Sequence, residues 1–135
     1  IPAQHTGDGA DQSPPLAWTG VPPGAVELAL ICEDRDAPTG DFVHWLVYNL
    51  PPTTTALKPG VKPTEPGFTQ GRNDFGQAGY RGPAPPPGKV HHYRFRLMAL
   101  DTRSGLGANA DKRQLRAAAK GHIIAETELV GTYQR

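Results

Sequence analysis

Acidic, imidazole and phenol side chains stand beside the apolar runs of this sequence. Asp34 and Asp36 follow the first long apolar run, and His44 lies inside the second. His91 and Tyr93 are two residues apart in a third run. Carboxylates, imidazoles and phenols can pass protons to one another or hold an anion by hydrogen bonds. These five residues are therefore the first candidates for a functional site.

Residue parity indicates that three of these groups point inward. Side chains alternate between the two faces of a β-strand. His91 and Tyr93 should share the apolar face of their strand, and His44 should share a face with the apolar residues of its own, which are Phe42, Leu46 and Tyr48. A buried polar group without a partner costs about 1–3 kcal/mol, so the three groups must bind one another or a ligand. A pocket built around them would satisfy this need.

Each candidate also has an ordinary structural interpretation. A single half-buried histidine is usually satisfied by protein partners, and an acid at the end of a strand usually faces water. His92 is expected on the outer face with Arg94 and Arg96, as a solvated or partner-facing surface outside the pocket. What favours a pocket is that three inward-facing polar groups occur together.

The elements that must position these groups are short strands. Sixteen Gly and fifteen Pro are more than a helical domain tolerates, because Pro removes a helix hydrogen bond and Gly weakens the helix entropically. Apolar or alternating runs of strand length predict four strands, at 25–34, 41–50, 90–100 and 122–133. A turn at 35–40 joins the first two strands, and 51–88 is expected to be a long functional loop along the surface.

One helix is expected, at 109–120. Its interior is rich in Ala, Asn109 or Asp111 can cap its start, and Gly121 can end it. Leu106 and Leu115 are its apolar anchors. The fold class that follows is mainly β, an antiparallel β-sandwich with one short helix in the C-terminal half and long Pro/Gly-rich loops, in a single domain covering 1–135.

Charge and composition exclude several classes of protein. The net charge is +1, with acids concentrated in residues 1–57 and bases after them. The bases are dispersed and form no Lys/Arg block, so no nucleic-acid partner is expected. No apolar stretch approaches the roughly 20 residues of a membrane span, which leaves at most peripheral membrane contact. The single cysteine, Cys32, excludes an internal disulfide.

Several motifs together resemble the phosphatidylethanolamine-binding protein family, and in particular its bacterial Raf-kinase-inhibitor-like branch. The motifs occur in this order: SPPLAWTGVPPG, EDRDAPTGDFVHWLVYNLP, QGRNDFGQAGYRGPAPPPG, HHYRFRLMALD and AAAKGHIIAETELVGTYQR. The resemblance covers nearly the whole chain. It implies an antiparallel β-sandwich with a small anion-accepting pocket at one end.

The resemblance also implies which residues form that pocket. The ligand-binding positions are Asp34, Asp36, His44, Gly82, Ala84, His91 and Tyr93, and the apolar walls are Pro38 and Phe42. The segment 79–95, GYRGPAPPPGKVHHYRF, is interpreted as a stiff pocket wall, in which glycines let backbone amides approach an anion and prolines fix the turn.

The sequence departs from the branch at three motifs and at its beginning. Members commonly have DPDAP, TCDG and GPCPP where this chain has DRDAP, TGDG and GPAPP. Two cysteines are therefore missing together, at Gly7 and Ala84. If the two positions are close in space, the chain has lost a thiol pair at the pocket rim. The opening strand expected before IPAQHT is also absent, which predicts an uncovered sheet edge.

The expected function is binding of a small anionic or zwitterionic phosphorylated ligand, either a phosphoethanolamine-like head group or a phosphorylated side chain. A regulatory role toward a kinase or other protein partner is an accompanying hypothesis, as is a homodimer. Two alternatives use the same residues: a weak hydrolase with an Asp–His pair, and a metal site at Asp34, Asp36, His44 and His91. No cofactor is expected. A cytoplasmic location is expected, or an exported one if a signal sequence has been removed.

Overall fold

A computed structural model of the chain describes residues 1–38 and 40–135. Thr39, which belongs to the predicted turn 35–40, lies outside the described residues. The elements are η1 (Ala3–His5), β1 (Leu16–Ala17), β2 (Glu27–Asp34), β3 (Phe42–Leu50), β4 (Ala56–Leu57), β5 (Thr69–Gln70), β6 (His91–Leu100), α1 (Lys112–Ala119) and β7 (Ile123–Tyr133). The four predicted strands and the helix correspond to β2, β3, β6, β7 and α1.

A five-stranded antiparallel sheet forms the centre of the molecule, in the order β5-β3-β2-β6-β7. Strand β2 lies between β3 and β6 and is covered on both faces, and all eight of its residues are buried. This burial agrees with its unbroken apolar sequence, because a strand covered on one face only would alternate. At the end of β2, Asp34 pairs with Phe42 of β3 and with Tyr93 of β6. The register thus brings the predicted site residues to one end of the sheet.

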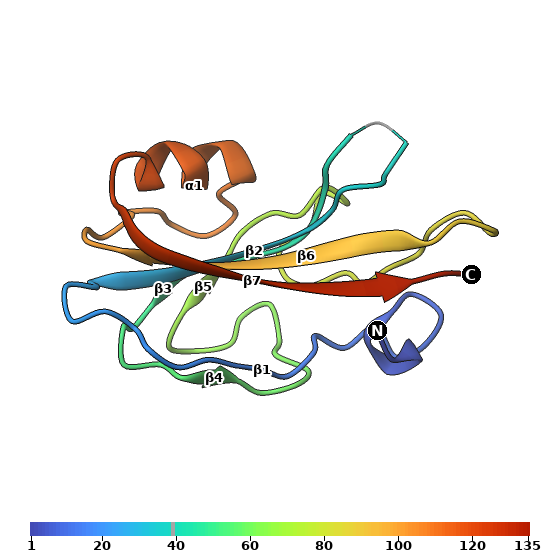
Figure 1. Ribbon diagram of the computed structural model, residues 1–135, viewed down its shortest axis with the longest axis horizontal. Coiled ribbons are helices and arrows are strands. Elements are labelled where there is room, and N and C mark those ends of the chain that lie inside the picture. The colour runs from blue at the N-terminus through green and yellow to red at the C-terminus, as the bar shows by residue number, and fades with distance from the viewer. Residues whose placement is uncertain (39) are drawn as a thin grey trace.

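The two faces of the sheet are covered by different layers. Helix α1 packs on one face, and the two-stranded sheet β1–β4 with the long loops packs on the other (Figure 1). The mainly β, antiparallel architecture predicted from the sequence is confirmed. Among the described residues, the second layer of the sandwich consists of the short β1–β4 sheet and loops. The loop layer covers the face that carries Trp45, Tyr93 and Phe95.

Helix α1 is held at its start by a capping box and by an ion pair between half-buried Lys112 and buried Glu33. The Asp111 carboxylate accepts from the backbone N–H of Gln114, and the Gln114 side chain accepts from the backbone N–H of Asp111. Lys112 donates from Nζ to the carboxylate of Glu33, which is 2% exposed beneath the helix. Leu115 is the buried anchor, as predicted. The sequence had left Asn109 and Asp111 as alternative caps, and the structure selects Asp111.

A one-residue shift in β3 corrects the parity prediction for that strand. Cys32 pairs with Trp45, whereas the next residue of β2, Glu33, pairs with Val43, so His44 is an extra residue in the ladder. Such bulges re-aim a side chain locally. Leu46 and Tyr48 therefore face α1, and the expectation that they share the face of His44 is wrong. His44 itself packs against Tyr93, on the loop side of the sheet.

Strand β7 is an edge strand, and among the described residues no strand pairs with its outer side. Leu129 and Val130 are 60% and 49% exposed. Near the end of this strand, the N-terminal amine of Ile1 donates to Thr132 O at 2.7 Å. The described helices include none that is long and apolar enough to cross a membrane.

Candidate functional site

A buried carboxylate–imidazole pair forms the base of the site. Asp34 at the end of β2 and His91 at the start of β6 are 4% and 3% exposed. Nδ1 of His91 lies 2.6 Å from Oδ2 of Asp34, so Nδ1 carries a hydrogen and donates to the carboxylate. The other carboxylate oxygen of Asp34 accepts from the backbone N–H of Asp36 at 2.8 Å. Both oxygens are thus in use, and the Nε2 atom of His91 points away from the pair.

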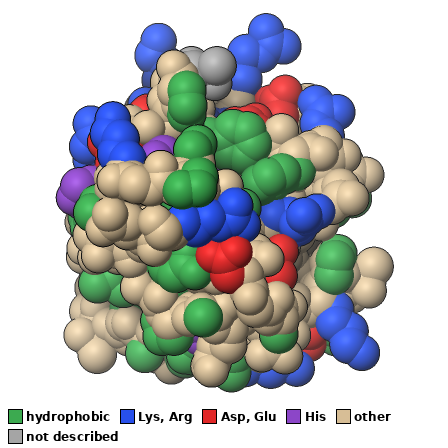
Figure 2. All heavy atoms as spheres, turned by 90° about the vertical axis from the view of Figure 1, so that its right-hand side faces the viewer, with side chains coloured by type: hydrophobic (Ala, Val, Ile, Leu, Met, Phe, Trp, Pro, Cys, Tyr) green, Lys and Arg blue, Asp and Glu red, His purple; other side chains and the backbone are tan. Residues whose placement is uncertain are grey.

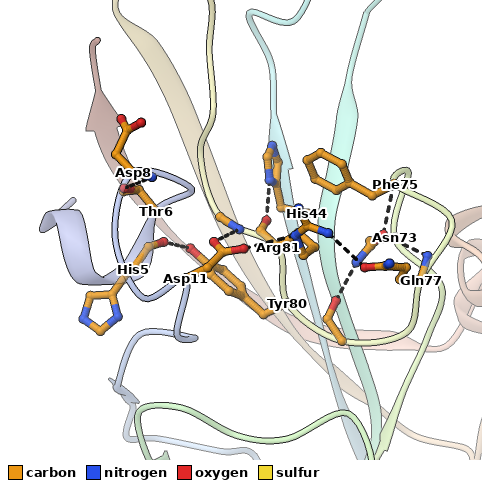
Figure 3. A network of polar contacts seen from close by, with 12 residues as sticks. His5, Thr6, Asp8, Asp11, His44, Asn73, Phe75, Gln77, Tyr80 and Arg81 are labelled. Carbon is orange, nitrogen blue, oxygen red and sulfur yellow. Dashed lines mark hydrogen bonds and ion pairs between the residues drawn. The ribbon is translucent and has the colours of Figure 1, made fainter.

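His44 is fixed by Arg81, which lies in the long surface segment 51–88. Nδ1 of His44 lies 2.5 Å from Arg81 O, and the backbone N–H of Arg81 donates to His44 O at 3.1 Å (Figure 3). Because a carbonyl can only accept, Nδ1 of His44 must carry the hydrogen, which leaves Nε2 as an acceptor in the neutral ring. Burial lowers the pKa of His44, although the Arg81 carbonyl and the Asp34 carboxylate oppose this. The neutral ring is thus favoured at neutral pH.

Tyr93 lies between the two imidazole rings. Its ring centroid is 5.2 Å from that of His44 in an edge-to-face arrangement and 6.5 Å from that of His91. Burial, with the Asp34 carboxylate as a second cause, raises the pKa of Tyr93 well above its ordinary value. Its hydroxyl therefore stays protonated and can donate a hydrogen bond at any physiological pH.

Three polar atoms of this cluster have no protein partner in the described part of the chain. They are Nε2 of His44, Nε2 of His91 and the hydroxyl of Tyr93. Every fully enclosed side-chain nitrogen or oxygen among the described residues does have a partner, so these three atoms must be open to solvent although their residues are at most 3% exposed. The site is therefore defined by these accessible atoms. These three atoms together form a small candidate binding site.

Aromatic rings and one cation form the rim, and two of these residues were missed by the sequence analysis. Phe42, predicted as a wall, is 5.3 Å from His44 between ring centroids, and Phe75 is 5.5 Å from His44. The guanidinium of Arg81 lies 5.0 Å from the Phe75 ring centroid. Phe75 and Arg81 lie in a loop without periodicity, so parity could not place them. Figure 2 looks onto this end of the sheet, where apolar side chains gather between Lys/Arg and Asp/Glu side chains.

The rim loop is held by two polar anchors. Buried Asn73 accepts from the backbone N–H groups of Phe75 and Gln77 and donates to Gly79 O (Figure 3). One side chain thus binds three backbone groups of the loop and holds Phe75 in place. Asp11 accepts from Nε of Arg81 at 3.1 Å and from the backbone N–H of the next residue at 2.7 Å. The orientation of Arg81 is thus set by Asp11.

Gly82 plays a different part from the one expected. Its backbone N–H, predicted to approach an anion, is bound by Asp11. A Cβ at this position would lie 2.2 Å from His5 O, so glycine permits close packing of the loop against the N-terminal segment. The Gly82 amide is therefore not free to bind a ligand.

The remaining predicted residues lie around the cluster. Asp36 accepts from the backbone N–H and from Nδ1 of His92, at 2.8 and 2.7 Å, on the outer face. These bonds lower the pKa of Asp36. Pro38 and Ala84 are exposed. The structure thus brings Asp34, His44, His91 and Tyr93 together and leaves the carboxylate of Asp36 outside the cluster.

The two positions that lack the cysteines of related proteins are neighbours. A Cβ at Gly7 would lie 3.1 Å from Cβ of Ala84, and Cβ atoms joined by a disulfide are about 3.5–4.5 Å apart. We expect the double variant Gly7→Cys/Ala84→Cys to form a disulfide after a shift of a few tenths of an ångström. Thiol titration under denaturing conditions should then find one free thiol, from Cys32, before reduction and three after it. Three free thiols in the oxidised sample would contradict the placement of these loops.

His44 should make stability depend on pH. Because its pKa in the folded protein is below the ordinary 6.5, the unfolded chain binds a proton at this position more readily than the folded chain. The free energy of unfolding should therefore fall as the pH is lowered through the ordinary histidine pKa, and His44→Gln should reduce this slope. Urea unfolding of both proteins between pH 5 and 8 measures the difference. Equal slopes would show that His44 titrates normally.

The metal alternative finds no support in the geometry. In residues 1–38 and 40–135 no group of three or more His, Cys, Asp or Glu side chains is arranged to hold an ion. Asp34 and His91 bind one another, Nδ1 of His44 binds a carbonyl, and Asp36 binds His92.

Comparisons with known proteins agree with the fold and with the resemblance. A profile of the family described as phosphatidylethanolamine-binding protein matches residues 1–134. A UPF0098 protein of Methanothermobacter thermautotrophicus is 48% identical, with all of this chain and 91% of the relative covered. A second UPF0098 protein, from Pyrococcus horikoshii, is 44% identical and covered over 71% of its length.

Two solved structures are similar over the whole chain. A phosphatidylethanolamine-binding protein homologue of Chlamydia trachomatis superposes with a TM-score of 0.92 at 40% identity, over 89% of its length. YbcL of Escherichia coli, described as a member of the mammalian family, superposes with a TM-score of 0.91 at 34% identity, over 90% of its length. The fold and the site thus place the chain in a class of antiparallel β-proteins that bind ligands. The chain belongs to the phosphatidylethanolamine-binding protein family.

Proposed function

We propose that the cluster at the end of the sheet binds the phosphorylated head group of a zwitterionic ligand, with phosphoethanolamine as the simplest example. One observation carries the proposal: three polar atoms of nearly buried side chains, on neighbouring rings, have no protein partner among the described residues. Polar atoms that stay accessible on otherwise buried side chains can bind a ligand without rearrangement of the protein. Membership of a family described by phosphatidylethanolamine binding gives independent support.

Each of the three atoms has a role toward a phosphate group. The Tyr93 hydroxyl donates to a phosphate oxygen, since its raised pKa keeps it protonated. Nε2 of His44 accepts a hydrogen, from a protonated phosphate oxygen or from the ammonium group of the ligand. Nε2 of His91 donates when that ring is protonated. Arg81 stands at the rim 5.0 Å from the Phe75 ring centroid, and its charge is offset by the ion pair with Asp11.

The Asp34 carboxylate does not prevent phosphate binding in this geometry. Both of its oxygens already accept hydrogen bonds, and the His91 ring stands between the carboxylate and Nε2. A zwitterion fits the site better than inorganic phosphate, because acceptors and donors are both present.

A hydrolase built on the Asp34–His91 pair is the competing function, and the available side-chain nucleophiles argue against a covalent route, which leaves water as the attacking group. The sequence contains two serines, Ser13 and Ser104. The Ser13 hydroxyl is buried and accepts from the backbone N–H of Val61, while that of Ser104 lies beside Asn49 on the other side of the protein core. Burial raises the pKa of the Cys32 thiol well above its ordinary value. None of the three can serve the pair as a nucleophile.

Calorimetric titration tests the proposal with adjacent histidines as a matched pair. His91 faces the cluster and is 3% exposed. His92 faces outward, and its side chain is 54% exposed. Phosphoethanolamine should bind the wild-type protein more tightly than inorganic phosphate or ethanolamine does. His91→Gln should weaken binding roughly tenfold or more, the loss expected for one charge-assisted hydrogen bond, and His92→Gln should leave it unchanged. Absence of binding, or equal losses in both variants, would overturn the proposal.

A further inference from the structure

A cavity of about 490 Å³ lies under the C-terminal end of α1, on the face of the sheet opposite the His44 cluster. Helix α1 covers this face in Figure 1. The cavity is lined by residues of β2, β6, α1, the turn after α1 and the start of β7. These residues are Ile31, Arg96, Met98, Arg116, Ala117, Ala119, Lys120, Gly121 and Ile123. The volume is within the range of about 300–1,000 Å³ that is typical of small-molecule sites.

The lining combines an apolar floor with three cations. Ile31, Met98 and Ala119 are buried, and Arg96, Arg116 and Lys120 stand around them. The described residues that line the cavity include no acid. Within the described chain, none of the three cations forms an ion pair with an acid.

The acids nearest to the cavity lie outside its lining. Glu128 lies across from Arg96 in the β6–β7 register, but its carboxylate binds Arg94. Glu33 beneath the helix binds Lys112. Glu126 lies across from Met98 in the same register, which places it on the helix side of the sheet, beyond the residues that line the cavity. The three cations of the lining therefore outnumber the one neighbouring glutamate that forms no ion pair among the described residues.

The helix dipole explains two of the cations but not the third. Arg and Lys in the last turn of a helix complement its negative end, which carries about half a charge. This accounts for Arg116 and for Lys120, the C-cap. Arg96 belongs to β6, where it lies next to Ile31 in the register. Three full positive charges exceed the partial negative charge of the helix end, so the cavity as a whole attracts an anion.

We propose that this cavity is a second binding site, for a small amphipathic anion. The carboxylate, sulfonate or phosphate group of the ligand is held by Arg96, Arg116 and Lys120, and its alkyl or aryl part lies over Ile31, Met98 and Ala119. A purely inorganic anion would leave the apolar floor wet, and a neutral apolar molecule would leave the cations unpaired. The site does not depend on the His44 cluster, which uses other residues on the other face.

Met98 makes this site directly observable. It is the only methionine of the chain and lies in the cavity floor at 2% exposure. In protein labelled with ¹³C at the methionine methyl group, the single resonance should shift and saturate during titration with decanoate. Decanol and inorganic phosphate should each produce a much smaller shift at the same concentration. No shift with decanoate, or an equal shift with decanol, would overturn the proposal.

Two arginines of the same helix provide the matched variants. Both line a neighbouring part of the surface beside Asp41 and Asp74, but only Arg116 also lines the cavity. Arg116→Gln should weaken decanoate binding roughly tenfold, as expected for loss of one charged hydrogen bond. Arg113→Gln removes the same charge and should change the affinity less than about twofold. Equal effects of the two variants would show attraction by net charge only and would contradict a defined site.

Discussion

Replacement of Lys112 by Met should lower the free energy of unfolding by about 3 kcal/mol, the lower end of the range for breaking a buried ion pair. Glu33, 2% exposed under α1, would keep its carboxylate but lose the cation that binds it. Its lateral neighbour Arg94 is already bound to Glu128. Urea unfolding monitored by tryptophan fluorescence measures the difference in unfolding free energy.

Two further variants separate the ion pair from the helix. Arg113→Met removes an exposed cation from the same turn and should change stability by less than about 0.5 kcal/mol. Glu33→Leu combined with Lys112→Met removes both charges and should recover most of the loss, because an apolar pair of similar size avoids the desolvation cost. If Lys112→Met is as stable as the wild type, the carboxylate is not enclosed as described.

Asp34→Ala should destabilise the protein by about 2–4 kcal/mol, because it leaves two hydrogen-bond donors without an acceptor. These donors are Nδ1–H of His91, which is buried, and the backbone N–H of Asp36. The His91 ring would also lose the group that orients it, so phosphoethanolamine binding should weaken in the same variant. Chemical denaturation and calorimetric titration measure the two effects.

Asp36→Ala is the matched control for this prediction. Asp36 also accepts two hydrogen bonds, both from His92, but that pair is exposed to solvent. Water can replace an exposed partner, so the effect on stability should be clearly smaller and ligand binding should be retained. A loss in Asp36→Ala as large as that in Asp34→Ala would mean that burial does not distinguish the two aspartates.

The strands could be predicted because local sequence determines them. The run 25–34 is apolar without alternation, and it became the central strand β2, which is buried on both faces. The alternation of His91, Tyr93 and Phe95 with polar neighbours correctly placed these three side chains on one buried face of β6. The periodicity of apolar residues indicates whether one or both faces of a strand are buried, and it can be read from the sequence of that strand alone.

The geometry of the site could be predicted only in part. His44 was expected to face the pocket by simple alternation, but it does so because a bulge interrupts alternation between Val43 and Trp45. Phe75 and Arg81 reach the rim through hydrogen bonds of Asn73 and Asp11 that span the chain. Such contacts depend on how the loops close, and neither composition nor periodicity records loop closure.

The central claim is that Nε2 of His44 and Nε2 of His91 meet the ligand, and nitrogen NMR of the imidazole rings tests it most directly. In ¹⁵N-labelled protein, long-range ¹H–¹⁵N spectra resolve the two nitrogens of each ring. During titration with phosphoethanolamine, the Nε2 resonances of both rings should move with one dissociation constant, and the Nδ1 resonances should move less because their partners, Arg81 O and the Asp34 carboxylate, remain in place. The outward-facing His92 should not respond. Unchanged Nε2 resonances of His44 and His91 at saturating phosphoethanolamine would contradict the account.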